Sequence, residues 1–131
     1  MVIDTSAIVA ILFAEAEASR MVSAIAAAPR RLLGAATVVE ASAIMVAKKG
    51  SAGEIALDAL LERLALEIVP VTAEAGAHAR SAYRRFGKGV GTPAVLNYGD
   101  CLSYGVARQL GEPLLFKGED FGRTDVEAAP Y

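Results

Sequence analysis

The sequence lacks several features that would place the protein in other classes. Its 131 residues include a single cysteine, Cys101, so no internal disulfide can form, which agrees with a reducing compartment. No uncharged apolar run approaches the roughly 20 residues that a membrane-spanning helix needs. No basic segment followed by a long apolar one precedes the first predicted strand. We therefore expect a cytoplasmic protein with no membrane span and no export signal.

Basic charge and histidine are also scarce. Thirteen basic and 15 acidic residues leave a net charge of −2, so a nucleic-acid partner would need a local basic patch or bound cations. His78 is the one histidine, and its position within a predicted helix favours a surface or interface role over catalysis. Cys101 has no ordered triad around it in the sequence, so a buried small side chain is favoured over a nucleophile.

What the sequence does contain is an alternation of short apolar strands and helices. Strands are predicted at residues 1–3, 32–33, 67–71 and 114–116, and helices at residues 6–14, 17–28, 36–49, 52–66, 72–86 and 97–110. This order predicts one α/β domain over residues 1–131, with a short parallel central sheet flanked by helices in an α/β/α sandwich. The glycine-rich connection at residues 87–93 follows a helix, unlike phosphate-binding loops, and is expected to be mobile.

Acidic residues recur where these strands end or helices begin. Asp4 follows the first strand, Glu40 and Asp100 lie near the starts of two helices, and Glu119 and Asp120 follow the last strand. In a parallel sheet these positions share one edge, so the carboxylates can meet. A divalent cation commonly offsets the repulsion within such a group. Oxygen ligands without histidine or cysteine spacing indicate Mg²⁺ or Mn²⁺ rather than zinc.

Taken singly, each acid is better explained as a helix cap. Asp4, Thr5 or Ser6 can cap the first helix, residues 37–40 fit a capping box, and residues 97–100 resemble one with Asp in the place of Glu. It is the convergence of several acids that favours a metal site. Phosphodiester hydrolysis is then the leading reaction class, because carboxylate-held metal ions commonly serve phosphate chemistry.

Four segments, taken in order, resemble a known family. They are Val-Ile-Asp-Thr-Ser-Ala at 2–7, Ala-Thr-Val-Val-Glu-Ala-Ser at 36–42, Leu-Asn-Tyr-Gly-Asp-Cys-Leu-Ser-Tyr-Gly-Val-Ala at 96–107 and Leu-Leu-Phe-Lys-Gly-Glu-Asp-Phe at 114–121. Their order and separations resemble those of the PIN-domain ribonucleases, and within them the VapC-type toxins of bacterial toxin-antitoxin pairs. The resemblance covers essentially the whole chain.

The resemblance implies that Asp4, Glu40 and Asp100 ligate Mg²⁺ or Mn²⁺ and position water for attack on an RNA phosphodiester, leaving 5′-phosphate and 3′-hydroxyl ends. Thr5 or Ser6 would support the site by hydrogen bonding to an acid or to a water.

It also implies a fourth acid, for which Asp120 is our choice and Glu119 and Asp125 are alternatives. The expected partners are an RNA substrate, a second copy of the chain in a homodimer, and a cognate VapB-type antitoxin. An arginine or lysine of the antitoxin could pair with the acids.

Two other functions are consistent with the same acids. One is a catalytically weak or inactive metal-binding interaction module, and the other is a different metal-dependent phosphohydrolase. Haloacid-dehalogenase-like phosphatases are disfavoured because they need a second acid two residues after Asp4, where Ser6 stands.

Basic and aromatic residues near the acids could contact RNA. The helix residues Arg80, Arg84, Arg85 and Lys88 could bind phosphates, but a solvated helix face is the favoured interpretation. Lys117 lies close to the acidic edge. Tyr98 and Tyr104 could stack on a base, although core packing is the default for both.

Overall fold

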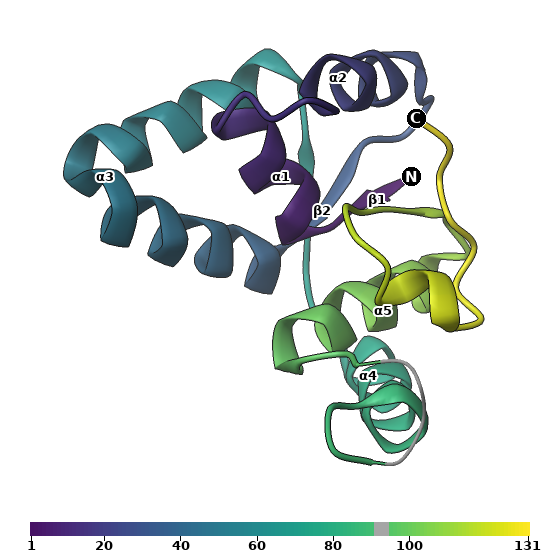
Figure 1. The fold of residues 1–131 in the computed structure, drawn as a ribbon. Helices are drawn as coiled ribbons and strands as arrows, with labels where there is room; N and C mark the ends of the chain where they lie inside the picture. The colour runs from purple at the N-terminus through teal and green to yellow at the C-terminus, as the bar shows by residue number, and fades with distance from the viewer. Residues whose placement is uncertain (91–94) are drawn as a thin grey trace.

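The computed structural model describes residues 1–90 and 95–131, so part of the predicted mobile loop at 87–93 lies outside the described residues. It is an α/β fold (Figure 1), as predicted. The elements in chain order are β1 (Val2–Ile3), α1 (Thr5–Leu12), α2 (Ala18–Ala27), β2 (Leu32–Gly34), α3 (Ala35–Arg63), β3 (Glu67–Val69), α4 (Ala73–Phe86), α5 (Tyr98–Leu110), β4 (Leu114–Leu115) and a 3₁₀ turn, η1 (Phe121–Arg123).

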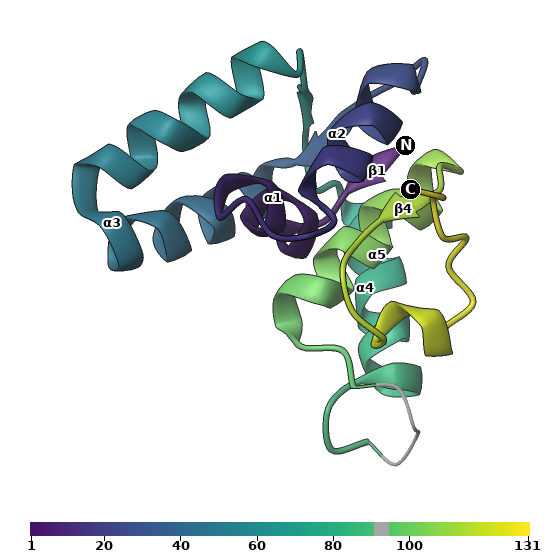
Figure 2. The same ribbon diagram turned by 45° about the horizontal axis from the view of Figure 1, so that its top comes forward.

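The four strands form one parallel sheet in the order β3-β2-β1-β4. Each strand is only two or three residues long, yet both faces of β1 are buried. Ile3 faces the core under α1, α2 and α3, whereas Val2 faces the core under α4 and α5. Figures 1 and 2 show these two groups of helices on opposite sides of the sheet, which confirms the predicted sandwich.

Helix α3 combines the two helices predicted at residues 36–49 and 52–66. The two segments meet at a kink at Gly50, whose φ of 59° and ψ of −148° are not helical, so the predicted break between the two helices is confirmed. Glycine tolerates this left-handed φ because it has no Cβ. Figure 1 shows α3 as an arm with two straight halves, the first leaving the sheet edge and the second returning toward β3.

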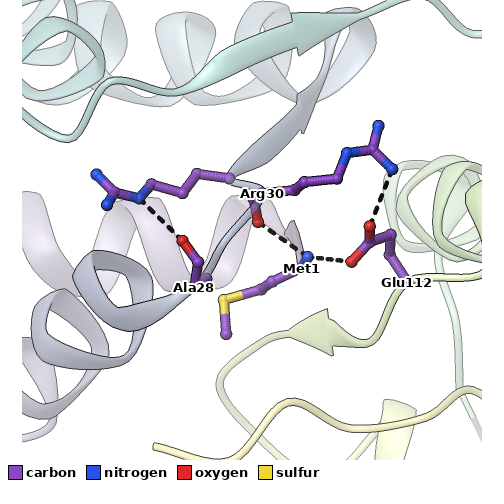
Figure 3. A network of polar contacts seen from close by, with 5 residues as sticks. Met1, Ala28, Arg30 and Glu112 are labelled. Carbon is purple, nitrogen blue, oxygen red and sulfur yellow. Dashed lines mark hydrogen bonds and ion pairs between the residues drawn. The ribbon is translucent and has the colours of Figure 1, made fainter.

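A polar network connects the segments at the N-terminal ends of the strands (Figure 3). The amino group of Met1 donates to the carbonyl oxygen of Arg30 at 3.0 Å and forms an ion pair with Glu112. Glu112 also accepts a hydrogen bond from Nη1 of Arg30 at 3.0 Å. The N-terminal end of β1 is thereby fixed against the segments that lead into β2 and β4.

No helix in the described part of the chain is both long and apolar enough to span a membrane.

Helices α4 and α5 approach each other closely at Gly105. A Cβ built on Gly105 would lie 2.3 Å from the carbonyl oxygen of Ala75, so no larger residue fits without moving the backbone. Ala79 lies at the same point, with its Cβ 3.1 Å from the position a Cβ of residue 105 would take. The absence of a side chain at residue 105 therefore sets the distance between these two helices.

Gly105→Ala should lower the free energy of unfolding by about 1–3 kcal/mol, because the added methyl group overpacks the interface. Gly76→Ala is the matched control, since a Cβ there meets nothing within 4 Å. Alanine is the better helix former by about 0.5–1 kcal/mol, so this second change should be neutral or stabilising. Urea unfolding of both variants tests the pair, and equal midpoints would contradict the close approach.

Candidate active site

Asp4 ends β1 next to β4. Its backbone N–H donates to the carbonyl oxygen of Leu115 at 2.9 Å, and its side chain caps α1. The Oδ2 atom accepts from the backbone N–H of Ser6 at 2.9 Å and from Ser6 Oγ at 2.6 Å. The residue is only 2% exposed, and Oδ1 is buried without a hydrogen-bond partner among the described residues. The capping role predicted for Asp4 is confirmed, yet capping uses only one of the two oxygens.

Glu40 lies in the second turn of α3, and its side chain reaches Thr5, the residue after Asp4. Its carboxylate accepts a hydrogen bond from Thr5 Oγ1. On the other side the carboxylate rests against the backbone of α5, because a Cβ built on Gly99 would lie 2.2 Å from Glu40 Oε1. Glu40 therefore bridges the starts of α1 and α5, two elements that are far apart in the sequence.

The capping box predicted at residues 37–40 is wrong. The helix begins at Ala35 with Gly34 as its N-cap, because β2 leads directly into α3 without an intervening turn. Thr37 is therefore already inside the first turn, where its buried hydroxyl lies 3.3 Å from Ser103 Oγ. Glu40 therefore does not cap this helix.

The capping box at residues 97–100 is confirmed. Asp100 Oδ2 accepts from the backbone N–H of Asn97 at 2.8 Å, and Asn97 Oδ1 accepts from the backbone N–H of Asp100 at 2.9 Å. Burial, together with the negative charges of Asp4, Glu40 and Asp120, raises the pKa of Asp100 to about 6. Three acids distant in the sequence thus act electrostatically on the same carboxylate.

Of the three candidates for the fourth acid, Asp125 is the one whose carboxylate is already bound to other side chains. Its carboxylate accepts a hydrogen bond from Tyr104 Oη at 2.6 Å and pairs with Arg85 at 2.9 Å, and these partners lower the pKa of Asp125. Asp125 therefore fastens the C-terminal segment to α4 and α5. Asp120 is exposed and its charge adds to the raised pKa of Asp100, and Glu119 is also exposed.

Ser6 and Lys117 connect the acids to the segment after β4. The backbone N–H of Lys117 donates to Ser6 Oγ at 2.9 Å, and that hydroxyl donates to Asp4. The ammonium group of Lys117 pairs with Glu15 and with Glu17, which raises the pKa of Lys117. The sequence did not reveal this pairing, because neither glutamate is near residue 117 in the chain.

Other residues singled out in the sequence have structural roles. Cys101 is buried, and burial together with the charge of Asp100 raises the pKa of its thiol to about 11, so the predicted buried small side chain is confirmed. Tyr104 packs in the core as expected. Tyr98 does not, because 77% of it is exposed, and the core-packing prediction is wrong for this residue. His78 is partly buried on α4.

The site is chemically suited to a hard divalent cation. Its acids offer only oxygen atoms, one of which is buried and unpaired, and they raise each other's affinity for positive charge. In the described residues no three acidic, histidine or cysteine side chains already surround a common point as ligands do. The carboxylates are thus neighbours that do not already form a closed set of ligands.

Comparison with known proteins agrees with this fold. A family model of the PIN domain matches residues 1–127. Ribonuclease VapC30 of Mycobacterium tuberculosis is 48% identical over 126 residues, covering 96% of this chain and 95% of the relative. Ribonuclease VapC of Mycolicibacterium smegmatis is 47% identical over 128 residues, covering 98% of each chain.

Solved structures show the same fold at much lower sequence identity. The crystal structure of Mycobacterium tuberculosis VapC20, a Sarcin-Ricin loop cleaving toxin, superimposes with a TM-score of 0.76 at 18% identity and covers 98% of both chains. A toxin-antitoxin complex from Klebsiella pneumoniae gives a TM-score of 0.74 at 17% identity, covering 99% of this chain and 97% of its own.

The chain therefore belongs to the PIN-domain family and, within it, to the VapC ribonucleases. It is a hydrolase of the endoribonuclease toxin class, as the resemblance implied.

Asp100→Asn should stabilise the protein in a chelating buffer at neutral pH. Because the folded-state pKa of Asp100 is raised to about 6, its ionised form destabilises the fold. Asparagine can still accept the capping hydrogen bond. With allowance for solvent screening we expect a gain of about 1–2 kcal/mol, largest above pH 6 and absent below about pH 4. Thermal melts across this pH range measure the difference, and a pH-independent gain would contradict the electrostatic cause.

Gly99→Ala should damage the site more than the fold. The new methyl group would displace the Glu40 carboxylate, which is the mobile end of a long side chain, so the unfolding midpoint should change little. Displacing this acid should reduce cleavage by roughly the 10- to 100-fold that loss of a supporting metal-site contact costs. Urea unfolding and RNA cleavage are measured on the same preparation. Full activity in this variant would show that Glu40 need not rest on α5.

Proposed function

We propose that the chain cleaves RNA by metal-dependent hydrolysis, with Asp4, Glu40 and Asp100 holding Mg²⁺ or Mn²⁺ and Asp120 completing the acidic group. The observation that carries the proposal is the buried, unpaired Oδ1 of Asp4 beside Asp100, whose pKa is raised by burial and by three neighbouring acids. A buried, unpaired oxygen on a residue that is only 2% exposed is costly unless a cation or a hydrogen-bond donor completes it. A bound divalent cation would lower the pKa of a water molecule and would stabilise the negative charge of the phosphate.

The hydroxyl residues support the proposed site by orienting the acids. Ser6 holds Oδ2 of Asp4 through both its backbone N–H and its hydroxyl, which leaves Oδ1 directed away from the cap. Thr5 holds one oxygen of Glu40 through its hydroxyl alone. In both acids one oxygen is occupied by a protein donor and the other is available. These contacts support the roles that the family resemblance assigns to Thr5 and Ser6.

We also propose that a small VapB-type antitoxin silences the site and that the chain forms a homodimer. Two structural neighbours come from toxin-antitoxin complexes, one from Klebsiella pneumoniae and one containing VapBC2 from Rickettsia felis bound to a DNA fragment from the promoter. The acids are suited to an inhibitor cation, since an arginine or lysine could pair with carboxylates that otherwise hold metal. Exposed Val39, next to Glu40 on α3, offers apolar surface beside them.

Asp4→Asn tests the proposed activity. Asparagine keeps the helix cap but removes the charge of the buried acid, so cleavage of structured RNA in Mg²⁺ or Mn²⁺ should fall by more than the roughly 100-fold limit typical of supporting residues. The thermal stabilisation of the wild-type protein by Mn²⁺ should also shrink. Product ends are mapped by sequencing, and the midpoint is measured by scanning fluorimetry.

Asp58→Asn is the matched control, because Asp58 is an exposed acid on the returning half of α3. It should cleave RNA and respond to Mn²⁺ as the wild type does. Cleavage that survives Asp4→Asn would place the activity elsewhere. Metal binding without any cleavage in the wild type would favour the inactive interaction module.

A further inference from the structure

A groove of about 670 Å³ lies between α4 and the start of α5, beside the acids. Its floor is apolar and comes from both helices, with Gly76 and Ala79 on α4 and Cys101 and Leu102 on α5. This volume falls within the range of about 300–1,000 Å³ that is usual for ligand sites.

A second hollow of about 370 Å³ lies between α3 and α5 and contains Glu40 itself, together with Val39 and Gly99. Tyr98 and Leu102 line both hollows, so the two meet at the start of α5. A chain lying along them would pass Glu40 and the start of α5, the helix that carries Asp100. The larger groove is thus positioned to hold the part of a polymer that flanks the reacting bond.

Tyr98 stands at this junction as an unburied aromatic residue. It is 77% exposed, immediately precedes Gly99 and lies two residues before Asp100. The ring adds little to the stability of the fold, in contrast to Tyr104, which is 2% exposed. An exposed aromatic ring beside a nuclease site is suited to stacking on a nucleobase, which tolerates any base sequence.

Arg80 and Arg84 supply positive charge along the other wall of the groove. They are four residues apart on α4 and therefore project from one face of the helix. Both are exposed, and within residues 1–90 and 95–131 neither forms an ion pair. Arg85, by contrast, pairs with Asp125 and stacks on Phe86 with 4.4 Å from its guanidinium carbon to the ring centroid.

We propose that this groove binds single-stranded RNA next to the bond that is cut, with Tyr98 stacking on a base and Arg80 and Arg84 contacting phosphates. The inference rests on the proposed ribonuclease function. RNA is a better occupant than a second copy of the chain, because a two-fold interface centred here would bring the arginines of both copies together. A polyanion instead pairs with them, and the arginines offset the repulsion that the neighbouring acids exert on its phosphates.

The chain contains no tryptophan, so Tyr98→Trp creates a single fluorescent reporter in the groove. The variant is combined with Asp4→Asn to prevent cleavage and is titrated with a short single-stranded RNA of mixed sequence. Stacking should quench the tryptophan emission in proportion to RNA bound. Tyr131→Trp in the same background is the control, because Tyr131 packs under Arg20 near α2 and should not respond.

Two results would overturn the inference: RNA binding without quenching at residue 98, or emission that changes with protein concentration alone. The second result would assign the groove to self-association, which sedimentation velocity measures directly.

Side-chain removal separates the two contributions. In the Asp4→Asn background, Tyr98→Ala should weaken RNA binding by roughly 5- to 150-fold, whereas Tyr98→Phe should retain it, because stacking needs the ring and not the hydroxyl. Arg80→Ala and Arg84→Ala should each reduce the slope of log K against log salt concentration by about 0.7. Arg63→Ala is the control, since Arg63 ends α3 just before β3, at the opposite edge of the sheet.

The groove and the ribonuclease function can fail separately. Unchanged binding and salt slope in the Tyr98 and arginine variants, with wild-type protein still cutting RNA, would refute the groove alone. RNA binding that depends on these residues in a protein that never cuts RNA would support the groove and refute the nuclease.

Discussion

The parallel pairing of β1 between β2 and β4 is the constraint on which the rest of the structure depends. The chain first adds strands on one side, from β1 to β2 to β3, and then crosses back to place β4 on the other side. The direction of strand order therefore reverses at β1. Ligand sites in open α/β sheets lie outside the carboxyl ends of the strands at such a reversal, and Asp4 stands at that point. The backbone hydrogen bond from Asp4 to Leu115 closes the pairing at this position.

Gathering acids at this edge is unfavourable in itself, and the fold offsets part of the cost with ordinary helix chemistry. Asp4 and Asp100 both sit at helix starts, where backbone N–H groups and the positive end of the helix dipole favour a carboxylate. This compensation is incomplete, since the pKa of Asp100 is still raised. Capping and metal binding are therefore compatible roles for one residue: the cap fixes one oxygen of Asp4, and the second oxygen stays unpaired.

Local patterns in the sequence predicted the elements and their convergence, because a parallel sheet gathers its strand ends whatever the details of packing. Features that depend on tertiary contact were not accessible in this way. The first turn of α3 was misplaced, since Thr37 is a plausible cap until its hydroxyl is seen buried against Ser103. A glycine just before an acid in a helix weakly indicates a close approach at Gly99. The sequence could not show that the group approaching it is the carboxylate of Glu40.

Electrostatics explains why α5 carries both the acid and the exposed ring. A chain with a net charge of −2 and a concentrated acidic group repels polyanions at long range, so attraction must come from close by. The close approach at Gly105 brings α4 against α5, and with it two arginines on one face of α4. The same helix start that presents Asp100 presents Tyr98 between the two hollows. Positive charge and stacking surface are thus held within reach of the acids by a single packed helix pair.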